Sequence, residues 1–248
     1  MKTMNPKLRL SIVACFFIFL MSSCIKDLGI EGSGVIITQY IDNLPGFSGI
    51  LSNGDYDVFI EQGNSNSYEV KVIADKNFVP YISFFVTNST LTIQNLGNHY
   101  FKDSQRVKIE ITVPYIEYVE LADKGLVNCD YVYNNSMEVY LSGSGKISML
   151  DLDTKDIKAT ISGIGDVEME GVAITGEFLI SGSGNIESSS KSFGNLELND
   201  CQVDITGSGA AYVFVFHNLS VNISGSGTVY YNGNPYIYSN TPSRVRPL

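Results

Sequence analysis

The sequence has no tryptophan, only two histidines, and few charged residues, which make up 17% of its 248 residues. His99 and His217 lack the close spacing of zinc ligands, which argues against a zinc site. Basic residues are also scarce, since 16 Lys and Arg stand against 26 Asp and Glu. The resulting net charge of −10 excludes recognition of nucleic acid through bulk charge. No segment carries the apolar stripe of an amphipathic helix, so we expect strands.

The N-terminus reads as an export signal. Lys2, Lys7 and Arg9 precede an apolar stretch from Leu10 to Met21, which is too short for a permanent membrane-spanning helix. The stretch ends in Leu-Met-Ser-Ser-Cys24, which resembles a bacterial lipobox with methionine in place of the usual leucine. We therefore expect residues 1–23 to be a lipoprotein signal peptide and Cys24 to be lipidated. The alternative is an ordinary signal peptide with an incidental cysteine.

Removal of residues 1–23 leaves 13 basic residues (16 minus 3) and all 26 acidic residues, a net charge of −13. Such a body is repelled by an anionic membrane surface, and acyl chains on Cys24 would hold it there. The glycine-containing segment 24–35 is expected to be the tether. We expect an outer-membrane lipoprotein, and the sequence leaves open whether it faces the periplasm or the cell exterior. Oligomeric state is also left open.

The second half of the sequence repeats one motif five times. An apolar pair is followed by a hydroxyl residue, Gly-x-Gly, and another apolar residue. The hydroxyl residues are separated by steps of 20, 19, 25 and 18 residues, a period typical of solenoid proteins. They are Ser142, Ser162, Ser181, Thr206 and Ser224.

Fifteen positions of these repeats are apolar in every copy. They stand three and one residues before the hydroxyl residue and five after it, which is the period-2 pattern of a strand on each side of a turn. The glycines allow tight corners that stack closely on one another. The expected corner glycines are Gly143, Gly145, Gly163, Gly165, Gly182, Gly184, Gly207, Gly209, Gly225 and Gly227.

This pattern predicts an all-β fold, a right-handed parallel β-helix with strands paired in register. Ser144, Ser183, Ser208 and Ser226 should then form a ladder of hydroxyl groups that Ile164 interrupts. We expect Cys129 and Cys201 to be separate buried thiols, because repeats spaced by about 4.8 Å would put them roughly 14–19 Å apart, beyond disulfide range.

Residues 36–248 are expected to form a single domain. Weaker copies of the motif run from Ile50 to Val58, with Ser52 as the hydroxyl residue, and from Glu120 to Val127. Residues 36–118 should form a broader region with longer strands that caps one end, followed by regular coils over 119–231. The proline-containing tail 232–248 should cover the last coil and then fray. The longer strands are expected at Tyr68–Ile73, Tyr81–Val86, Thr90–Gln94 and Arg106–Val113, with turns at Gly63-Asn64 and Asn88-Ser89.

On these motifs the chain resembles the autotransporter adhesin head GIN domain family, common as lipoproteins in Bacteroidetes. The resemblance covers about residues 40–230. It rests on Gly46–Ile50, Leu51–Asp55 with the following Glu61–Gly63, the strand before Ala74–Asn77, and the serial Ser-Gly-Ser-Gly corners. The family implies a secreted or surface β-helical body, and it supplies no catalytic residues or cofactor.

A carbohydrate-active β-helix enzyme, either a polysaccharide lyase or a glycosidase, is the alternative function. It requires clustered carboxylates in a groove, or acids beside basic residues and Ca²⁺. The strongest acidic cluster is Asp151, Asp153 and Asp156, a weak candidate for a metal site and more simply a solvated loop. The repeated serines mark structural corners, because a catalytic nucleophile is needed only once. No catalytic residue and no cofactor is therefore expected.

Tyrosines crowd one stretch before and within the first repeat. Such side chains on a flat β surface can stack on sugars or anchor protein contacts, although they can also simply pack the strand faces. We take the function to be non-enzymatic adhesion, recognition or scaffolding, with a glycan or protein ligand. The candidate binding residues are Tyr115, Tyr118, Tyr131, Tyr133 and Tyr140.

Overall fold

The computed structural model describes residues 29–63, 68–97, 99–102, 107–188 and 195–248. The described residues are all-β, with no α-helix and two short 3₁₀ turns, Val79–Tyr81 and Pro242–Arg244. None of them forms a helix with the length and apolar character needed to cross a membrane. The strands are β1 Ile30–Glu31, β2 Ile36–Tyr40, β3 Gly49–Asn53, β4 Tyr56–Gln62, β5 Glu69–Asp75, β6 Ile82–Thr87, β7 Thr90–Asn95, β8 Phe101–Lys102, β9 Val107–Val113, β10 Tyr118–Leu121, β11 Gly125–Tyr133, β12 Ser136–Leu141, β13 Lys146–Ile161, β14 Asp166–Ile180, β15 Ile186–Glu187, β16 Leu196–Ile205, β17 Ala210–Ile223, β18 Thr228–Gly233, β19 Tyr236–Ser239 and β20 Val245–Pro247.

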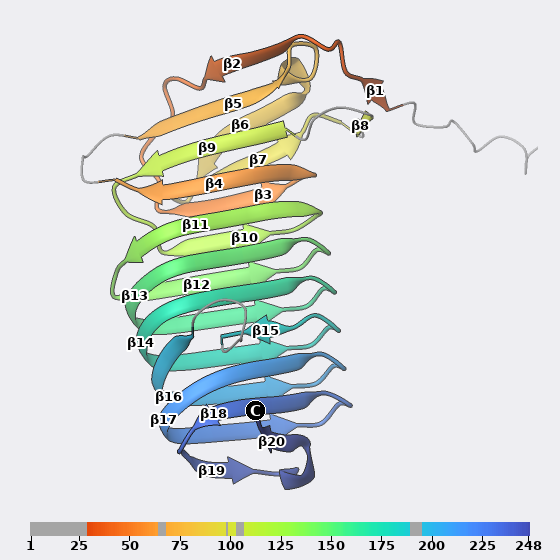
Figure 1. Cartoon of the computed structure of the whole chain (residues 1–248). Helices are drawn as coiled ribbons and strands as arrows, with labels where there is room; N and C mark the ends of the chain where they lie inside the picture. Colours follow the sequence, from red (N-terminus) through yellow and green to blue (C-terminus); the bar gives the residue numbers. More distant parts are fainter. Residues whose placement is uncertain (1–28, 64–67, 98, 103–106, 189–194) are drawn as a thin grey trace, which may run out of the picture.

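Successive repeats pair in parallel, as the sequence predicts. β10, β12 and the second halves of β13 and β14 are neighbours on one side of the corners, and β4, β11 and the first halves of β13 and β14 are neighbours on the other. Figure 1 shows the corners as pointed turns aligned along one edge of the stack. All fifteen apolar positions predicted to be inward are at most 3% exposed and belong to one continuous core.

The glycine corners stack through backbone hydrogen bonds. Ile164, Ser183 and Ser208 each donate their N–H to a glycine carbonyl of the preceding corner, at 3.0–3.1 Å. A Cβ atom on Gly163 would overlap the carbonyl oxygen of Gly143, so the corner requires glycine for close backbone approach. In the predicted ladder the hydroxyls of Ser183 and Ser208 form a rung at 2.9 Å, and Ile164 is 69% exposed.

The sequence aligns the copy that begins at Ile50 with Ser52 at the corner position. In the structure this copy is displaced by one residue relative to that alignment. Ser52 lies level with the buried Leu121, so Asn53 occupies the corner. The Ser52 side chain is fully buried, and among the described residues its Oγ has no hydrogen-bond partner. This shift places Val58 level with Val127 in the core. With Ser52 at the corner, the side chain of Val58 would have pointed outward.

The N-terminal repeats do not stack in chain order. β7 and β9 pair in parallel with β3 and β4, so the later strands lie outside the earlier ones. β2, β5 and β6 then close this end through antiparallel pairs. Strands are found at the four places expected here, with ends within two residues for those described. The expectation that they are the longer ones is wrong, because β5, β6, β7 and β9 have six or seven residues, whereas β13, β14 and β17 of the regular coils have 14 to 16. Asn88 and Ser89 form the predicted turn with positive φ angles. The expected turn at Gly63-Asn64 lies partly outside the described residues.

The 25-residue step results from an insertion between β15 and β16. Ile186 and Glu187 keep the register of the stack, and pairing with β14 resumes at Leu196. Ser188 closes the base of the insertion, because its N–H and its hydroxyl both donate to the carbonyl of Tyr212, at 2.8 and 2.9 Å.

The tail does not fray as expected. β19 and β20 continue the stack in parallel with β17 and β18, and the N–H of Leu248 donates to the carbonyl of Tyr231 at 2.8 Å. Arg244 closes the last corner, since its Nη1 donates to the carbonyls of Gly225 (2.7 Å) and Gly227 (3.4 Å). In earlier repeats these glycine carbonyls accept hydrogen bonds from backbone N–H groups of the following corner.

Replacing Gly163 with alanine should lower the free energy of unfolding by at least about 3 kcal/mol, because the new Cβ overlaps backbone that cannot move without breaking the stack. Gly176→Ala is the matched control. Its Cβ would meet side-chain atoms and no backbone, the two Cδ atoms of Leu198 at 3.1 Å and Cζ of Phe178 at 3.4 Å, and we expect a change below about 1 kcal/mol. Urea unfolding followed by circular dichroism measures both. Equal losses would contradict the stacking argument.

Arg244→Ala should lower the free energy of unfolding by about 1.5–3 kcal/mol, because it removes charge-assisted hydrogen bonds and leaves two corner carbonyls without their donor. Arg246→Ala, an exposed arginine on β20, should change it by less than about 0.5 kcal/mol. Thermal unfolding of the two variants compares them, and an Arg246 effect as large as that of Arg244 would refute the capping role.

Candidate functional site

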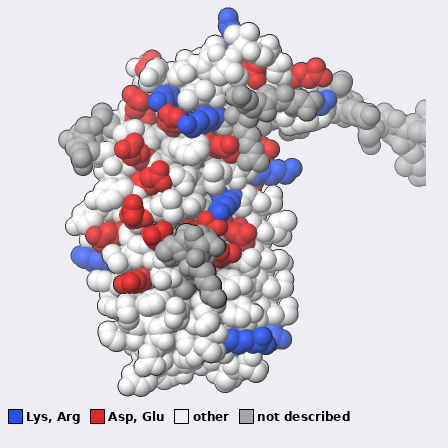
Figure 2. All heavy atoms as spheres, viewed as in Figure 1, with Lys and Arg blue, Asp and Glu red and all other residues white. Residues whose placement is uncertain are grey.

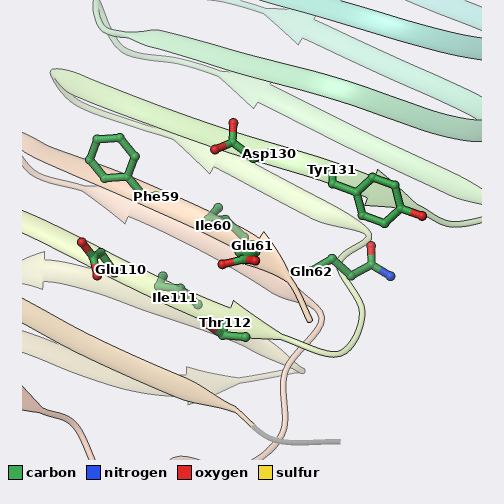
Figure 3. Close-up of a pocket in the computed structure, with 9 residues that line it drawn as sticks. All are labelled: Phe59, Ile60, Glu61, Gln62, Glu110, Ile111, Thr112, Asp130 and Tyr131. Carbon is green, nitrogen blue, oxygen red and sulfur yellow. The ribbon is translucent and has the colours of Figure 1, made fainter. Parts of the chain in front are cut away.

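A cavity of about 490 Å³ opens on the stack near its N-terminal end, over three neighbouring parallel strands (Figure 3). β4 lies between β9 and β11, so segments far apart in the sequence form one surface. The lining residues are Phe59, Ile60, Glu61 and Gln62 from β4, Glu110, Ile111 and Thr112 from β9, and Asp130 and Tyr131 from β11.

Two exposed carboxylates stand side by side in this groove. Glu61 is level with Asp130 on one neighbouring strand and with Thr112 on the other. Since adjacent strands are about 4.8 Å apart, the two carboxylates extend from neighbouring positions. Asn128 donates a hydrogen bond to Oδ1 of Asp130 at 2.7 Å, which orients that carboxylate.

The third carboxylate of the groove is already neutralised. Glu110 forms ion pairs with Lys108 (2.6 Å) and Lys71 (2.5 Å), and the hydrogen bonds from these two lysines hold the pKa of Glu110 below its usual value. The Lys108 ammonium also lies 4.7 Å from the centre of the Phe59 ring. Glu110 therefore helps to build the groove wall.

Gln62 fixes the end of β11. Its Oε1 accepts the N–H of Tyr133 at 3.0 Å, while its Nε2 donates to the carbonyls of Tyr133 (3.0 Å) and Pro114 (3.3 Å). The side-chain amide thus pairs with backbone in the manner of a further strand residue, and it holds the segment that carries Tyr131.

Tyr131 has an unusual backbone conformation at the edge of the groove. Its φ is +55°, in the left-handed region that costs most residues roughly 1–2 kcal/mol, and its side chain is 55% exposed. The equivalent residue of the next repeat is Asp151, which has the same φ and tolerates it better. The left-handed bend therefore recurs in successive repeats, and at Tyr131 it carries an exposed aromatic ring beside two carboxylates.

The five candidate tyrosines do not gather at one site. Tyr118 and Tyr140 pack against each other at 5.9 Å between ring centres on β10 and β12, on the other side of the corners. Burial and the hydrogen bond that Tyr118 donates to Glu120 raise the pKa of Tyr118, and burial likewise raises that of Tyr115. Tyr133 is exposed at the end of β11. Only Tyr131 lines the cavity.

The acidic cluster predicted as a weak metal candidate is divided between different surroundings. Asp151 occupies the left-handed bend, Asp153 lies level with Tyr133, and Asp156 accepts a hydrogen bond from Thr175 at 2.5 Å. Within the described ranges, no three His, Cys, Asp or Glu side chains are arranged to hold a metal ion. The cluster therefore gives no support to a metal site.

Cys129 and Cys201 are free and buried, so the predicted separation of the two thiols is confirmed. Burial raises the pKa of both thiols, which makes them unreactive in the folded chain. Cys24, the predicted lipidation site, lies outside the described residues.

Residues 46–235 match the family model described as "Putative auto-transporter adhesin, head GIN domain". The chain belongs to this family. This match confirms the resemblance that the sequence motifs indicated. At the level of the family, it indicates an adhesion-like character and a cell-envelope or surface location for this GIN domain. Among curated proteins, none matches the chain.

Solved structures share the fold of this GIN domain. An adhesin-like protein of Bacteroides fragilis, described as a putative adhesin, is 22% identical with a TM-score of 0.75, covering 88% of this chain and 96% of its own. A protein of Parabacteroides distasonis described as a putative lipid binding protein is 21% identical with a TM-score of 0.70, covering 88% and 99%. A putative adhesin of Parabacteroides merdae is 18% identical with a TM-score of 0.63, covering 89% and 99%.

Tyr131→Gly should leave the stability of this GIN domain unchanged or raise it by up to about 1.5 kcal/mol, because glycine relieves a left-handed strain of roughly 1–2 kcal/mol and costs about 0.5–1 kcal/mol in chain entropy. Tyr133→Gly, at an equally exposed neighbour, should lower stability by about 0.5–1 kcal/mol. Chemical denaturation compares them. A larger loss for Tyr131→Gly would show that the backbone there is not strained.

Raising the pH should destabilise the fold through the two buried thiols. Their folded pKa values are raised, whereas unfolded thiols ionise near about 8.5, so the stabilisation is complete below that pH and is lost as the pH rises. We expect a loss of about 2–3 kcal/mol between pH 8 and pH 9.5 in urea unfolding. The Cys129→Ala, Cys201→Ala double variant should lack this slope. If the double variant loses as much unfolding free energy with pH as the wild type, groups other than the two thiols cause the loss.

Proposed function

We propose that this GIN domain is a lipid-anchored, non-enzymatic adhesion and recognition module of the cell envelope. The adhesin description of the family supports the non-enzymatic character and the envelope location. The lipobox-like end of the signal supports lipidation at Cys24 after removal of residues 1–23. Protease shaving of intact cells decides whether the anchored protein faces the periplasm or the cell exterior.

In this proposal, residues 36–248 form one right-handed parallel β-helix. The expected tether 24–35 is shorter than the sequence indicated, because Ile30–Glu31 pairs in parallel with β8 and the N–H of Gly34 donates to Oδ1 of Asp75 at 2.6 Å, which holds the chain to the body from Ile30 on. The parallel, in-register pairing from β7 and β9 to β19 and β20 supports a single elongated body with one core. The first described strand lies at the end opposite the C-terminus in Figure 1, so a tether at the N-terminus would leave the rest of the stack extending away from the anchor.

The observation that carries the proposal is the groove over β9, β4 and β11. Its strands are fixed by in-register pairing, its edge is held by Gln62, and the backbone that carries its exposed ring is in a left-handed conformation. Such a preformed site loses little conformational entropy on binding, which suits a recognition module. Figure 2 shows acidic side chains over the upper and middle parts of this face, with basic side chains among them, and a lowest part that is mostly uncharged apart from one basic patch.

A carbohydrate-active enzyme is the second candidate, and the pair Glu61 and Asp130 is the observation that favours it. Glu61 and Asp130 are level with each other on strands whose backbones lie about 4.8 Å apart, and a retaining glycosidase uses two carboxyl groups about 5–5.5 Å apart. A general acid, however, works from apolar surroundings, and both of these side chains are exposed to solvent. The groove therefore supports binding more strongly than hydrolysis.

Cells that make the full chain should incorporate labelled palmitate into it and adhere to a mucin-coated or epithelial surface several-fold better than cells lacking it. Cys24→Ala should abolish labelling and adhesion, because the anchor is lost, whereas Cys15→Ala, within the signal, should change neither. Protease shaving of intact cells reports which side of the membrane the chain faces. Labelling without adhesion to any surface would reject the adhesive role, and release of reducing sugar from added polysaccharide would favour the enzyme.

A further inference from the structure

The exposed ring of Tyr131 is positioned before any ligand arrives. Its backbone is in the left-handed conformation, and the following Tyr133 is tied to Gln62 by two hydrogen bonds of 3.0 Å. In Figure 3 the ring stands at the end of β11 above Gln62, at the edge of the cavity. A half-exposed aromatic face on a fixed strand offers a flat apolar platform, and the C–H face of a pyranose ring matches it.

The groove offers hydrogen-bond acceptors beside that platform. Glu61 and Asp130 extend from neighbouring positions of β4 and β11, and ionised carboxylates accept hydrogen bonds without donating any. The vicinal hydroxyl groups of a sugar are donors that such a pair can hold together. Thr112, level with Glu61 on the other side, adds a hydroxyl that both donates and accepts.

The charge of the groove selects among ligands. Three carboxylates, Glu61, Asp130 and Glu110, face two lysines, Lys71 and Lys108, which are both paired with Glu110. The local net charge is therefore −1, too small to attract a polycation strongly. The carboxylates of Glu61 and Asp130 and the net charge of −10 on the whole chain oppose acidic polysaccharides and anionic lipid headgroups.

We propose that this groove binds an uncharged glycan, with a sugar ring stacked on Tyr131 and its hydroxyl groups donating to Glu61 and Asp130. The cavity of about 490 Å³ is within the range of about 300–1,000 Å³ common for small-ligand sites. This inference rests on the proposed recognition function and names the ligand class of the same site. Gln62 is a positioning residue, which acts through the segment that carries Tyr131.

The test is binding of the intact chain, in mild detergent, to an array of neutral, acidic and amino-sugar glycans together with lysine-rich peptides. We expect signal on neutral glycans, insensitive to salt because no net charge is exchanged. Titration of the strongest neutral glycan then gives an affinity for each variant. Signal confined to acidic glycans, or to lysine-rich peptides and lost in high salt, would overturn the proposal, as would no signal at all.

Tyr131→Gly should weaken the affinity at least tenfold without loss of thermal stability. The Glu61→Gln, Asp130→Asn double variant should also weaken it at least tenfold, because it replaces carboxylates, which only accept hydrogen bonds, with amides, which both donate and accept them. Asp151→Gly is the control, because it changes the same left-handed position one repeat away and should leave affinity unchanged. Gln62→Leu should weaken binding through a misplaced ring, and wild-type affinity in Tyr131→Gly would reject the platform.

The adhesion assay separates this inference from the proposed function. Adhesion that persists in cells carrying Tyr131→Gly, with no neutral glycan bound on the array, would reject the glycan groove and leave the adhesive role standing. Neutral glycan binding by a chain whose cells do not adhere would keep the groove and reject adhesion. Loss of both binding and adhesion in Tyr131→Gly alone, with Asp151→Gly unaffected, would support both.

Discussion

The close backbone contact between successive Gly-x-Gly corners is the constraint on which the rest of the structure depends. At each corner a backbone N–H meets a carbonyl of the preceding repeat, that of Asp123 at the first corner and that of a glycine at the later ones, at a distance that leaves no room for a Cβ atom. Because side chains alternate with period 2 along each strand, a slip of one residue at a corner would turn the core positions outward. The corners therefore fix register, and register fixes both the core and the surface.

The surface follows from that register in a specific way. Glu61 and Asp130 form a pair only because β4 and β11 stack level with each other, and Tyr131 reaches the groove only because β11 bends at a left-handed residue. The two ends of the stack are closed differently. Antiparallel strands cover the N-terminal end, whereas a single guanidinium, that of Arg244, substitutes at the C-terminal end for the N–H groups of a missing corner.

Much of this could be predicted from the sequence, because the corners, the fifteen apolar positions and the parallel pairing depend on local patterns of glycine and alternation. The groove could not, since its residues belong to β9, β4 and β11, and the stacking of β9 outside β4 reverses the order of the chain. The hydroxyl of Ser52 was misleading, and the apolar Val58 was the signal for the true register. Among the candidate tyrosines, composition could not distinguish Tyr131 from Tyr118, because only backbone conformation and burial separate them.

Native-state amide hydrogen exchange at the corners tests the central claim most directly. The amides of Ile164, Ser183 and Ser208 are in turns, where exchange is usually fast, yet each donates to the corner before it. If corner stacking fixes the register, these amides should exchange only through global unfolding, with the same protection free energy as buried strand amides such as that of Ile180. Exchange at the rate of an open surface turn, while the strand amides stay protected, would show that the corners follow the fold instead of determining it.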